Sequence, residues 1–278
     1  MMTRHYKVAG HIFAVNGSNE LFEQMENYEP FRCEGGEPLF TLTECSGVVP
    51  EYTEVFRQEE DGAYIACGHT DSGNDVYVFT GQRNTWGCLI CSKDYREGRF
   101  IMTGHISKLV IDNSLMIMYA LATAGKDTLL FHAALVSLEG KGYLFLGPSG
   151  TGKSTHARLW LEHIEGTELV NDDNPVVRDG VVYGSPWSGK TPCYRNVSYP
   201  IGGIVMLSQA PYNKIRRLKG IEAYVDLAES VGGKIWDSRI AEGQHQTENT
   251  LASTIPMWHL ECLPDEAAAR LCHDTIKR

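Results

Sequence analysis

Residues 141–155, KGYLFLGPSGTGKST, are the stretch that decides the fold of this chain. The apolar run from Tyr143 to Leu146 is bounded by glycines and predicts a buried strand. Residues 147–154 fit the pattern G-x-x-x-x-G-K-(S/T), and apolar side chains at helical spacing follow at 156–161. A strand, a glycine-rich loop and a helix in this order are typical of a P-loop, which binds the phosphates of a nucleotide.

The residue types in this loop suit an anionic ligand. Glycines let the backbone turn sharply and bring its N–H groups close to a phosphate, and the dipole of the following helix favours an anion at the same place. We expect Lys153 to reach the terminal phosphates and Ser154 to hold Mg²⁺ by its hydroxyl. The predicted nucleotide-binding residues are Gly147, Ser149, Gly150, Thr151, Gly152, Lys153, Ser154 and Thr155.

The composition is typical of a globular protein. The chain has 278 residues, enough for one large domain or two moderate ones, and 42% of them are hydrophobic. A formal net charge of −10 argues against a general nucleic-acid or anionic-membrane surface. No run of about 18 apolar residues predicts a membrane span, and residues 1–7 are not followed by a signal-type apolar core. We therefore expect a cytoplasmic location.

The eight cysteines lie mostly inside apolar stretches, which suits reduced and buried thiols. Cys88 and Cys91 form a single C-x-x-C pair. Without a partner pair, this spacing is only a weak indication of a zinc or redox site. We interpret both as ordinary strand residues.

The first hundred residues are rich in strand patterns. Candidate strands lie at 6–15, 39–43, 63–67 and 76–79, and a helix is predicted to open at 16–18. The acidic run 59–61 is interpreted as a solvated turn. We predict a β-rich N-terminal domain over residues 1–104 and a second domain over residues 105–278. The N-terminal domain would help to select the acceptor, which is the molecule that receives a phosphoryl group from the nucleotide.

The second domain alternates helices with strands. We expect a helix over 106–124, then one strand over 129–138 that turns tightly at 139–142 into the P-loop strand, so the two strands must be antiparallel. After the P-loop helix, the remaining predictions are a strand at 167–173, a hairpin at 175–183, a glycine- and proline-rich loop at 184–192, strands at 201–207 and 257–262, and helices at 222–230 and 266–276. The fold class is α/β, with a mixed sheet of the α+β type.

Two carboxylates, Asp172 and Asp173, close the strand that follows the P-loop helix. One carboxylate would supply a hard oxygen ligand to Mg²⁺, and the other would take the proton from an attacking hydroxyl. The structural alternative is an acidic strand end or a helix N-cap, where aspartate is also favoured.

Three motifs in order carry a resemblance to a known family. FHAA at 131–134, then the P-loop about fifteen positions after His132, then LVNDD at 169–173 resemble the shared core of HPr kinase/phosphorylase and phosphoenolpyruvate carboxykinase. The resemblance covers roughly residues 105–210 and implies a phosphoenolpyruvate-carboxykinase-like P-loop core. The first hundred residues do not resemble the N-terminal domain of HPr kinase, and the carboxykinase domain that binds oxaloacetate is not found.

The resemblance also implies roles for individual residues. Asp172 matches the base that deprotonates a serine hydroxyl in the kinase, and Asp173 matches the metal ligand beside it. His132 matches the strand histidine that is a metal ligand in the carboxykinase; the alternative is a core histidine bonded to a backbone partner.

In the loop after the hairpin, Lys190 is a candidate for steadying the transferring phosphoryl group, against the alternative of a surface lysine. Arg195 is a weaker candidate of the same kind.

The first functional hypothesis is an ATP- and Mg²⁺-dependent kinase for a serine or another hydroxyl of a peptide, a protein or a small molecule. Its catalytic residues are Asp172, Lys153 and Lys190, and its metal ligands are Ser154, Asp173 and His132. Two alternatives stay open: a carboxykinase-like decarboxylating enzyme that uses Mn²⁺, and a non-catalytic nucleotide-binding regulatory module. ATP, GTP and pyrophosphate all stay open as donors, as does a homo-oligomer; neither nucleic acid nor a membrane is an expected partner.

Overall fold

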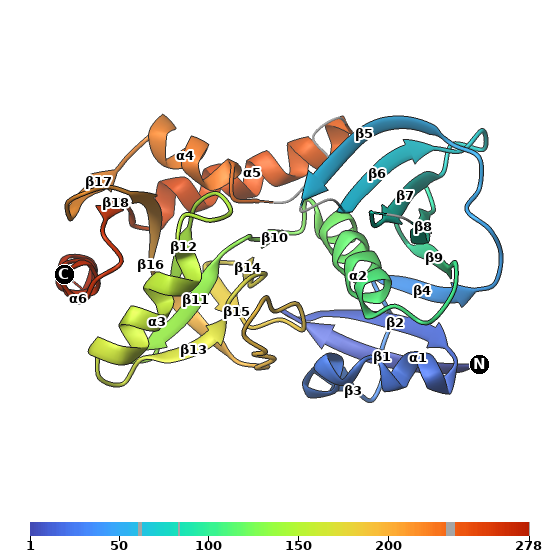
Figure 1. Cartoon of the computed structure of the whole chain (residues 1–278), viewed down its shortest axis with the longest axis horizontal. Helices are drawn as coiled ribbons and strands as arrows, with labels where there is room; N and C mark the ends of the chain where they lie inside the picture. Colours follow the sequence, from blue (N-terminus) through green and yellow to red (C-terminus); the bar gives the residue numbers. More distant parts are fainter. Residues whose placement is uncertain (61–62, 83, 232–236, 278) are drawn as a thin grey trace. The chain divides into compact units, whose positions relative to one another are not determined.

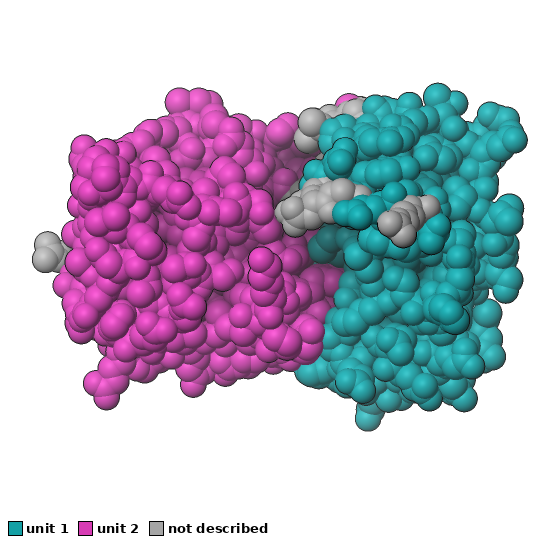
Figure 2. All heavy atoms as spheres, in the orientation of Figure 1, with its two compact units in different colours: residues 1–122 teal, residues 123–278 magenta. Residues whose placement is uncertain are grey.

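The computed structural model of the chain describes residues 1–60, 63–82, 84–231 and 237–277. The chain divides into two compact units, Met1–Ala122 and Thr123–Arg278, which Figure 2 shows in different colours. Each unit has its own sheet, and each is described by itself.

The described part of the first unit is built on a nine-stranded mixed sheet in the order β3-β1-β2-β4-β9-β8-β7-β6-β5 (Figure 1). Its strands are β1 (Met2–Val8), β2 (His11–Gly17), β3 (Arg32–Cys33), β4 (Phe40–Cys45), β5 (Thr53–Glu60), β6 (Ala63–His69), β7 (Asp75–Thr80), β8 (Thr85–Cys91) and β9 (Glu97–Met102). The predicted β-rich character is confirmed. The acidic run was expected as a turn, but Glu59 lies in β5, and Asp61 lies outside the described residues.

Two short helical segments follow β2, and a long helix closes the first unit. α1 (Asn19–Glu23) begins after Ser18, whose hydroxyl caps it by accepting the N–H of Leu21 at 3.1 Å. A 3₁₀ helix, η1 (Glu26–Phe31), comes next. The long helix is α2 (Lys108–Thr123).

Helix α2 packs on the sheet of the first unit. Met118 Sδ lies 3.1 Å from the place that a Cβ at residue 98 would take, so Gly98 allows the close approach. The hydroxyl of Tyr119 donates to the carbonyl of Val8 at 3.0 Å. The compact units divide after Ala122, whereas the sequence predicts a domain boundary after residue 104. The density of apolar residues indicates that a helix is buried, but not which sheet buries it.

Cys88 and Cys91 lie buried in β8, as interpreted from the sequence. Burial raises the pKa of the Cys88 thiol to about 11. Because successive strand residues alternate between the two faces of a sheet, side chains three positions apart point to opposite faces. The pair therefore does not form a joint metal or redox site.

The second unit is a mixed sheet in the order β10-β14-β15-β16-β12-β11-β13, with β18 beside β16 and β17 beside β18. Its strands are β10 (Thr128–Leu130), β11 (Ala134–Leu138), β12 (Lys141–Leu146), β13 (Glu168–Asn171), β14 (Val176–Arg178), β15 (Val181–Tyr183), β16 (Ser198–Gln209), β17 (Lys214–Leu218) and β18 (Met257–Cys262). Its helices are α3 (Lys153–His163), α4 (Ile221–Ala228), α5 (Ser238–Thr254) and α6 (Glu266–Ile276).

The strand β12 is buried on both faces, as its uninterrupted apolar run predicts. Leu144 and Leu146 belong to a core that also includes side chains of α4 and α5. Tyr143 and Phe145 belong to another core, with Trp160 of α3 and with side chains of α6. The sheet therefore lies between two helical layers (Figure 1), so the mixed α/β class is confirmed. Within the described residues, every helix is too short or too polar to cross a lipid bilayer.

The prediction of a single strand over 129–138 is wrong, because the strand is interrupted between β10 and β11. The backbone amides of Phe131, His132 and Ala133 donate to the carbonyls of Pro175, Ser230 and Asp173 instead of continuing one ladder. The predicted antiparallel turn into the P-loop strand is confirmed by the pairing of β11 with β12. Helix α5 and strand β17 were not predicted.

Candidate phosphate-binding site

Strand pairing brings the three motifs to one edge of the second sheet. β11 is antiparallel to both β12 and β13, with Ala134 opposite Phe145 and Leu135 opposite Asn171. The start of β11 therefore lies between the ends of β12 and β13. Two strand spacings, about 10 Å in total, separate those two ends. The P-loop follows β12, Asp172 follows β13, and His132 precedes β11.

The P-loop has the backbone that its glycines predict. Gly147, Gly150 and Gly152 have φ angles of 142°, 81° and 102°, which disfavour any residue with a side chain. At residue 147 a Cβ would also lie 2.8 Å from Thr151 Oγ1 and 3.0 Å from the carbonyl oxygen of Leu207. Gly152 is the N-cap of α3 and has no side chain, so the first N–H groups of this helix stay available to an anion.

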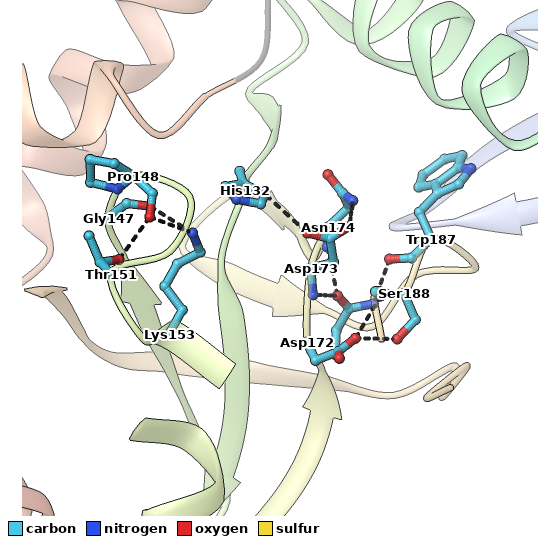
Figure 3. A network of polar contacts seen from close by, with 12 residues as sticks. His132, Gly147, Pro148, Thr151, Lys153, Asp172, Asp173, Asn174, Trp187 and Ser188 are labelled. Carbon is cyan, nitrogen blue, oxygen red and sulfur yellow. Dashed lines mark hydrogen bonds and ion pairs between the residues drawn. The ribbon is translucent and has the colours of Figure 1, made fainter. Parts of the chain in front are cut away.

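Lys153 folds back over the loop. Its side chain is buried, and Nζ donates to the carbonyl of Gly147 at 2.7 Å and to that of Pro148 at 3.2 Å (Figure 3). Thr151 Oγ1 donates to the same Pro148 carbonyl at 2.8 Å. The ammonium group is thus held within the curve of the loop, where a phosphate oxygen could replace the carbonyls. Ser154 is exposed, and no contact among the described residues joins it to Asp173.

His132 and Asp173 form a pair at this edge. Nδ1 of His132 lies 3.0 Å from Oδ1 of Asp173, and the two side chains are 46% and 32% exposed. Asn174 Nδ2 donates to Oδ2 of Asp173 at 2.7 Å. Since the imidazole is half-exposed and faces a carboxylate, His132 is not the core histidine of the structural alternative. Figure 3 shows the pair facing each other.

Asp172 points away from this pair and binds the loop after β15. Its Oδ1 accepts the hydroxyl of Ser188 at 2.6 Å and the N–H of Gly189 at 2.7 Å, and its Oδ2 accepts the N–H of Thr191 at 2.8 Å. The residue is 5% exposed. Both carboxylate oxygens therefore have donors within the protein, and little of the group is open to a substrate.

Asn171 organises the turn that carries both aspartates, and sequence reasoning missed its role. It is completely buried, and its Oδ1 accepts the N–H groups of Asp173 at 2.9 Å and Asn174 at 2.8 Å. Its Nδ2 donates to Ser185 Oγ and to the carbonyl of Trp187, both at 3.1 Å. Asparagine often forms turns, because its side chain can accept from the amides two and three residues ahead. An asparagine directly before the Asp pair could therefore have indicated this turn.

The chain matches no protein-family model and no curated protein.

The remaining predicted residues lie in the loop tied to Asp172. Lys190 is exposed between two residues that Asp172 binds, so it lies beside the Asp pair as expected. Arg195 is engaged elsewhere: it donates to the carbonyl of Leu169 at 2.9 Å and pairs with Glu168 at 2.7 Å. Trp187 of the same loop is buried, and its carbonyl accepts from Asn171 Nδ2 at 3.1 Å.

No group of three or more His, Cys, Asp or Glu side chains in the described residues is arranged to hold a metal by itself. Mg²⁺ differs in its needs, since it usually takes one or two protein ligands and completes its shell with water and substrate phosphates. Ser154 and Asp173 fit this smaller requirement, because both are accessible and both present oxygen.

Proposed function

We propose that the second unit transfers a phosphoryl group from a nucleotide to a hydroxyl acceptor. The observation that supports this best is the strand register, which brings the P-loop, His132 and the Asp pair to one sheet edge. The same order of motifs in the core of HPr kinase and phosphoenolpyruvate carboxykinase also supports it. We propose that the sheet is a core of that kind.

In this proposal Lys153 binds and neutralises the terminal phosphates, and Lys190 approaches them from the loop tied to Asp172. Mg²⁺, when bound, would neutralise the charge of the phosphates; Ser154 would hold it together with phosphate oxygens and water. The first N–H groups of α3 would complete the anion site.

We assign the proton acceptor to Asp173, supported by His132, and not to Asp172 as predicted. A general base needs a lone pair that the substrate can reach. Asp172 has three donors within the protein and is 5% exposed, whereas Asp173 has one partner on each oxygen and a side chain that is 32% exposed. The imidazole, whose Nδ1 lies 3.0 Å from Oδ1, orients the carboxylate of Asp173. Asp172 then acts as a positioning residue for the loop that carries Lys190.

The test compares Asp173→Asn with Asp172→Asn. Acceptors are found by mass spectrometry after the protein is incubated with Mg-ATP and candidate serine-containing peptides, as a gain of one phosphate. We expect Asp173→Asn to lower kcat at least 100-fold, in line with general base catalysis, and to leave ATP binding within threefold. Asp172→Asn, which would displace the loop of Lys190, should lower kcat less than Asp173→Asn does. If Asp173→Asn phosphorylates the acceptor as fast as wild type, the base assignment is wrong.

The His132–Asp173 pair favours one second candidate, a carboxykinase-like decarboxylating enzyme. There the imidazole and the carboxylate would both be ligands of Mn²⁺, a role that their separation of 3.0 Å permits. It predicts that nucleotide turnover depends on oxaloacetate, and that His132→Gln weakens Mn²⁺ binding measured by electron paramagnetic resonance. Without oxaloacetate-dependent turnover this candidate is excluded. ATP binding without any turnover would instead favour a regulatory module.

A further inference from the structure

A cavity of about 610 Å³ adjoins the P-loop on the side of β16 and β18. Its walls come from three parts of the second unit: the P-loop with the first turns of α3, the end of β16, and the end of β18. The lining residues that matter here are Thr155, His156, Leu207, Gln209, Ala210 and Leu263. Apart from Thr155, whose N–H lies in the first turn of α3, none of them has a part in the phosphotransfer described above.

The cavity lies where an open α/β sheet places its ligands. β12 is parallel to β16, and β16 is parallel to β18, so their carboxyl ends share one edge. Ligands of such sheets bind in the crevice beyond these ends. The P-loop follows the end of β12, and the cavity lies beyond the ends of the next two strands. A ligand bound by the P-loop could therefore extend into the cavity.

The P-loop and the cavity share a wall. Gln209, the last residue of β16, donates from Nε2 to the carbonyl of Gly150 at 3.0 Å. Gly150, Thr151 and Gly152 line the cavity as well. A group bound in the cavity would thus lie directly beside an anion bound by the loop.

The walls suit a flat, partly polar group. Leu159, Leu207 and Leu263 offer apolar surface, while His156 and Gln209 add polar side chains. The His156 side chain is buried, and its Nε2 accepts the indole N–H of Trp160 at 3.2 Å. Because the ring is neutral and Nε2 is the acceptor, its proton is on Nδ1. Apolar walls with a few fixed polar groups are typical of sites for cofactor-sized ligands.

We propose that this cavity holds the nucleoside of the phosphoryl donor, so that the donor is a nucleoside triphosphate and not pyrophosphate. This inference rests on the proposed function, which assigns the phosphates to the P-loop. It adds the residues that recognise the rest of the donor: Leu207 and Leu263 pack against the base, and Gln209 and His156 lie within its reach.

The experiment measures binding of Mg-ATP and of Mg-tripolyphosphate by calorimetry. Tripolyphosphate has the phosphate chain but no nucleoside. Ala210→Phe fills the cavity, and Leu263→Ser removes part of its apolar wall; Leu263 is 38% exposed, so the fold should tolerate the change. Leu161→Ser is the matched control, because Leu161 is 39% exposed on α3 but does not line the cavity.

We expect wild type to bind ATP at least tenfold more tightly than tripolyphosphate. Ala210→Phe and Leu263→Ser should lose that advantage and bind tripolyphosphate within twofold of wild type, while Leu161→Ser should match wild type for both ligands. If the two cavity variants bind ATP as wild type does, or if wild type binds both ligands equally, the cavity does not hold the nucleoside. If wild type binds neither ligand, the phosphate site itself is wrong, and the assignment of the cavity falls with it.

Discussion

At the scale of single residues, His156 couples the pH to the stability of the second unit. Burial lowers the pKa of its imidazole from 6.5 to about 4. Above pH 6.5 the ring is neutral in both the folded and the unfolded chain and contributes nothing to the pH dependence. Between pH 6.5 and about 4 the unfolded chain takes up a proton that the folded chain does not, so stability falls as the pH falls.

The expected loss over this range is about 3 kcal/mol, since each pKa unit is worth about 1.4 kcal/mol. His156→Gln should keep an acceptor for Trp160 and remove this pH dependence. The measurement is urea unfolding at pH 7.5, 5.5 and 4.5, with exposed His105→Gln as the control. An unfolding free energy of His156→Gln that falls with pH as steeply as that of wild type would contradict the prediction.

The residues of the site show where sequence reasoning at this scale succeeds. The P-loop glycines were predictable because their φ angles follow from the residue type and from a local pattern. The different roles of Asp172, which anchors a loop, and Asp173, which stays accessible, were not predictable. They depend on donors from Ser188, Gly189 and Thr191, which approach Asp172 only in the folded chain. Two adjacent carboxylates in a sequence carry no information about such partners.

At the scale of elements, the loop that carries Lys190 depends on one carboxylate. The amides of Gly189 and Thr191 both donate to Asp172, and charge-assisted hydrogen bonds contribute about 1.5–3 kcal/mol each. Asp172→Asn removes the charge and one acceptor. We expect the exchange of these two amides with deuterium to become at least tenfold faster, measured by hydrogen exchange with mass spectrometry.

Asp173→Asn is the matched control for this loop. Asp173 pairs with His132 and Asn174, so its replacement should leave exchange in the loop unchanged. Equal protection of the loop in both variants would show that Asp172 does not anchor it. If deuterium exchange became faster in Asp173→Asn alone, Asp173 would be the residue that anchors the loop. Asp172 would then again be the candidate base.

The elements themselves were predictable where pattern and turn were both local. The hairpin of β11 and β12 and the helix α6 lie where the sequence indicates, because each is defined by its own periodicity and its own cap or turn. The break between β10 and β11 was not predictable. The apolar run from Leu129 to Leu138 is continuous, and the carbonyls that divert it belong to Asp173, Pro175 and Ser230.

At the scale of the whole molecule, the position of α2 determines where the chain can be divided. Five of its apolar side chains are at most 1% exposed: Val110, Ile111, Leu115, Met118 and Tyr119. Contacts with the first sheet account for part of this burial: Val110 Cγ1 lies 3.1 Å from the Cβ position at Gly87, and Tyr119 packs edge-on against Phe13. An apolar helix with these partners should not be separable from the first unit.

A chain that begins at Thr123 should therefore fold alone and stay soluble. A chain that begins at His105 should be less soluble. The longer chain carries α2 without its sheet, and each large side chain left in water costs about 1.5–3 kcal/mol. We expect the 123–278 chain to be monomeric, to unfold in one transition and to bind Mg-tripolyphosphate within threefold of the full chain. The 105–278 chain should aggregate in size-exclusion chromatography. If the longer chain is instead the soluble one, α2 belongs with the second unit, and the boundary predicted at residue 104 is supported.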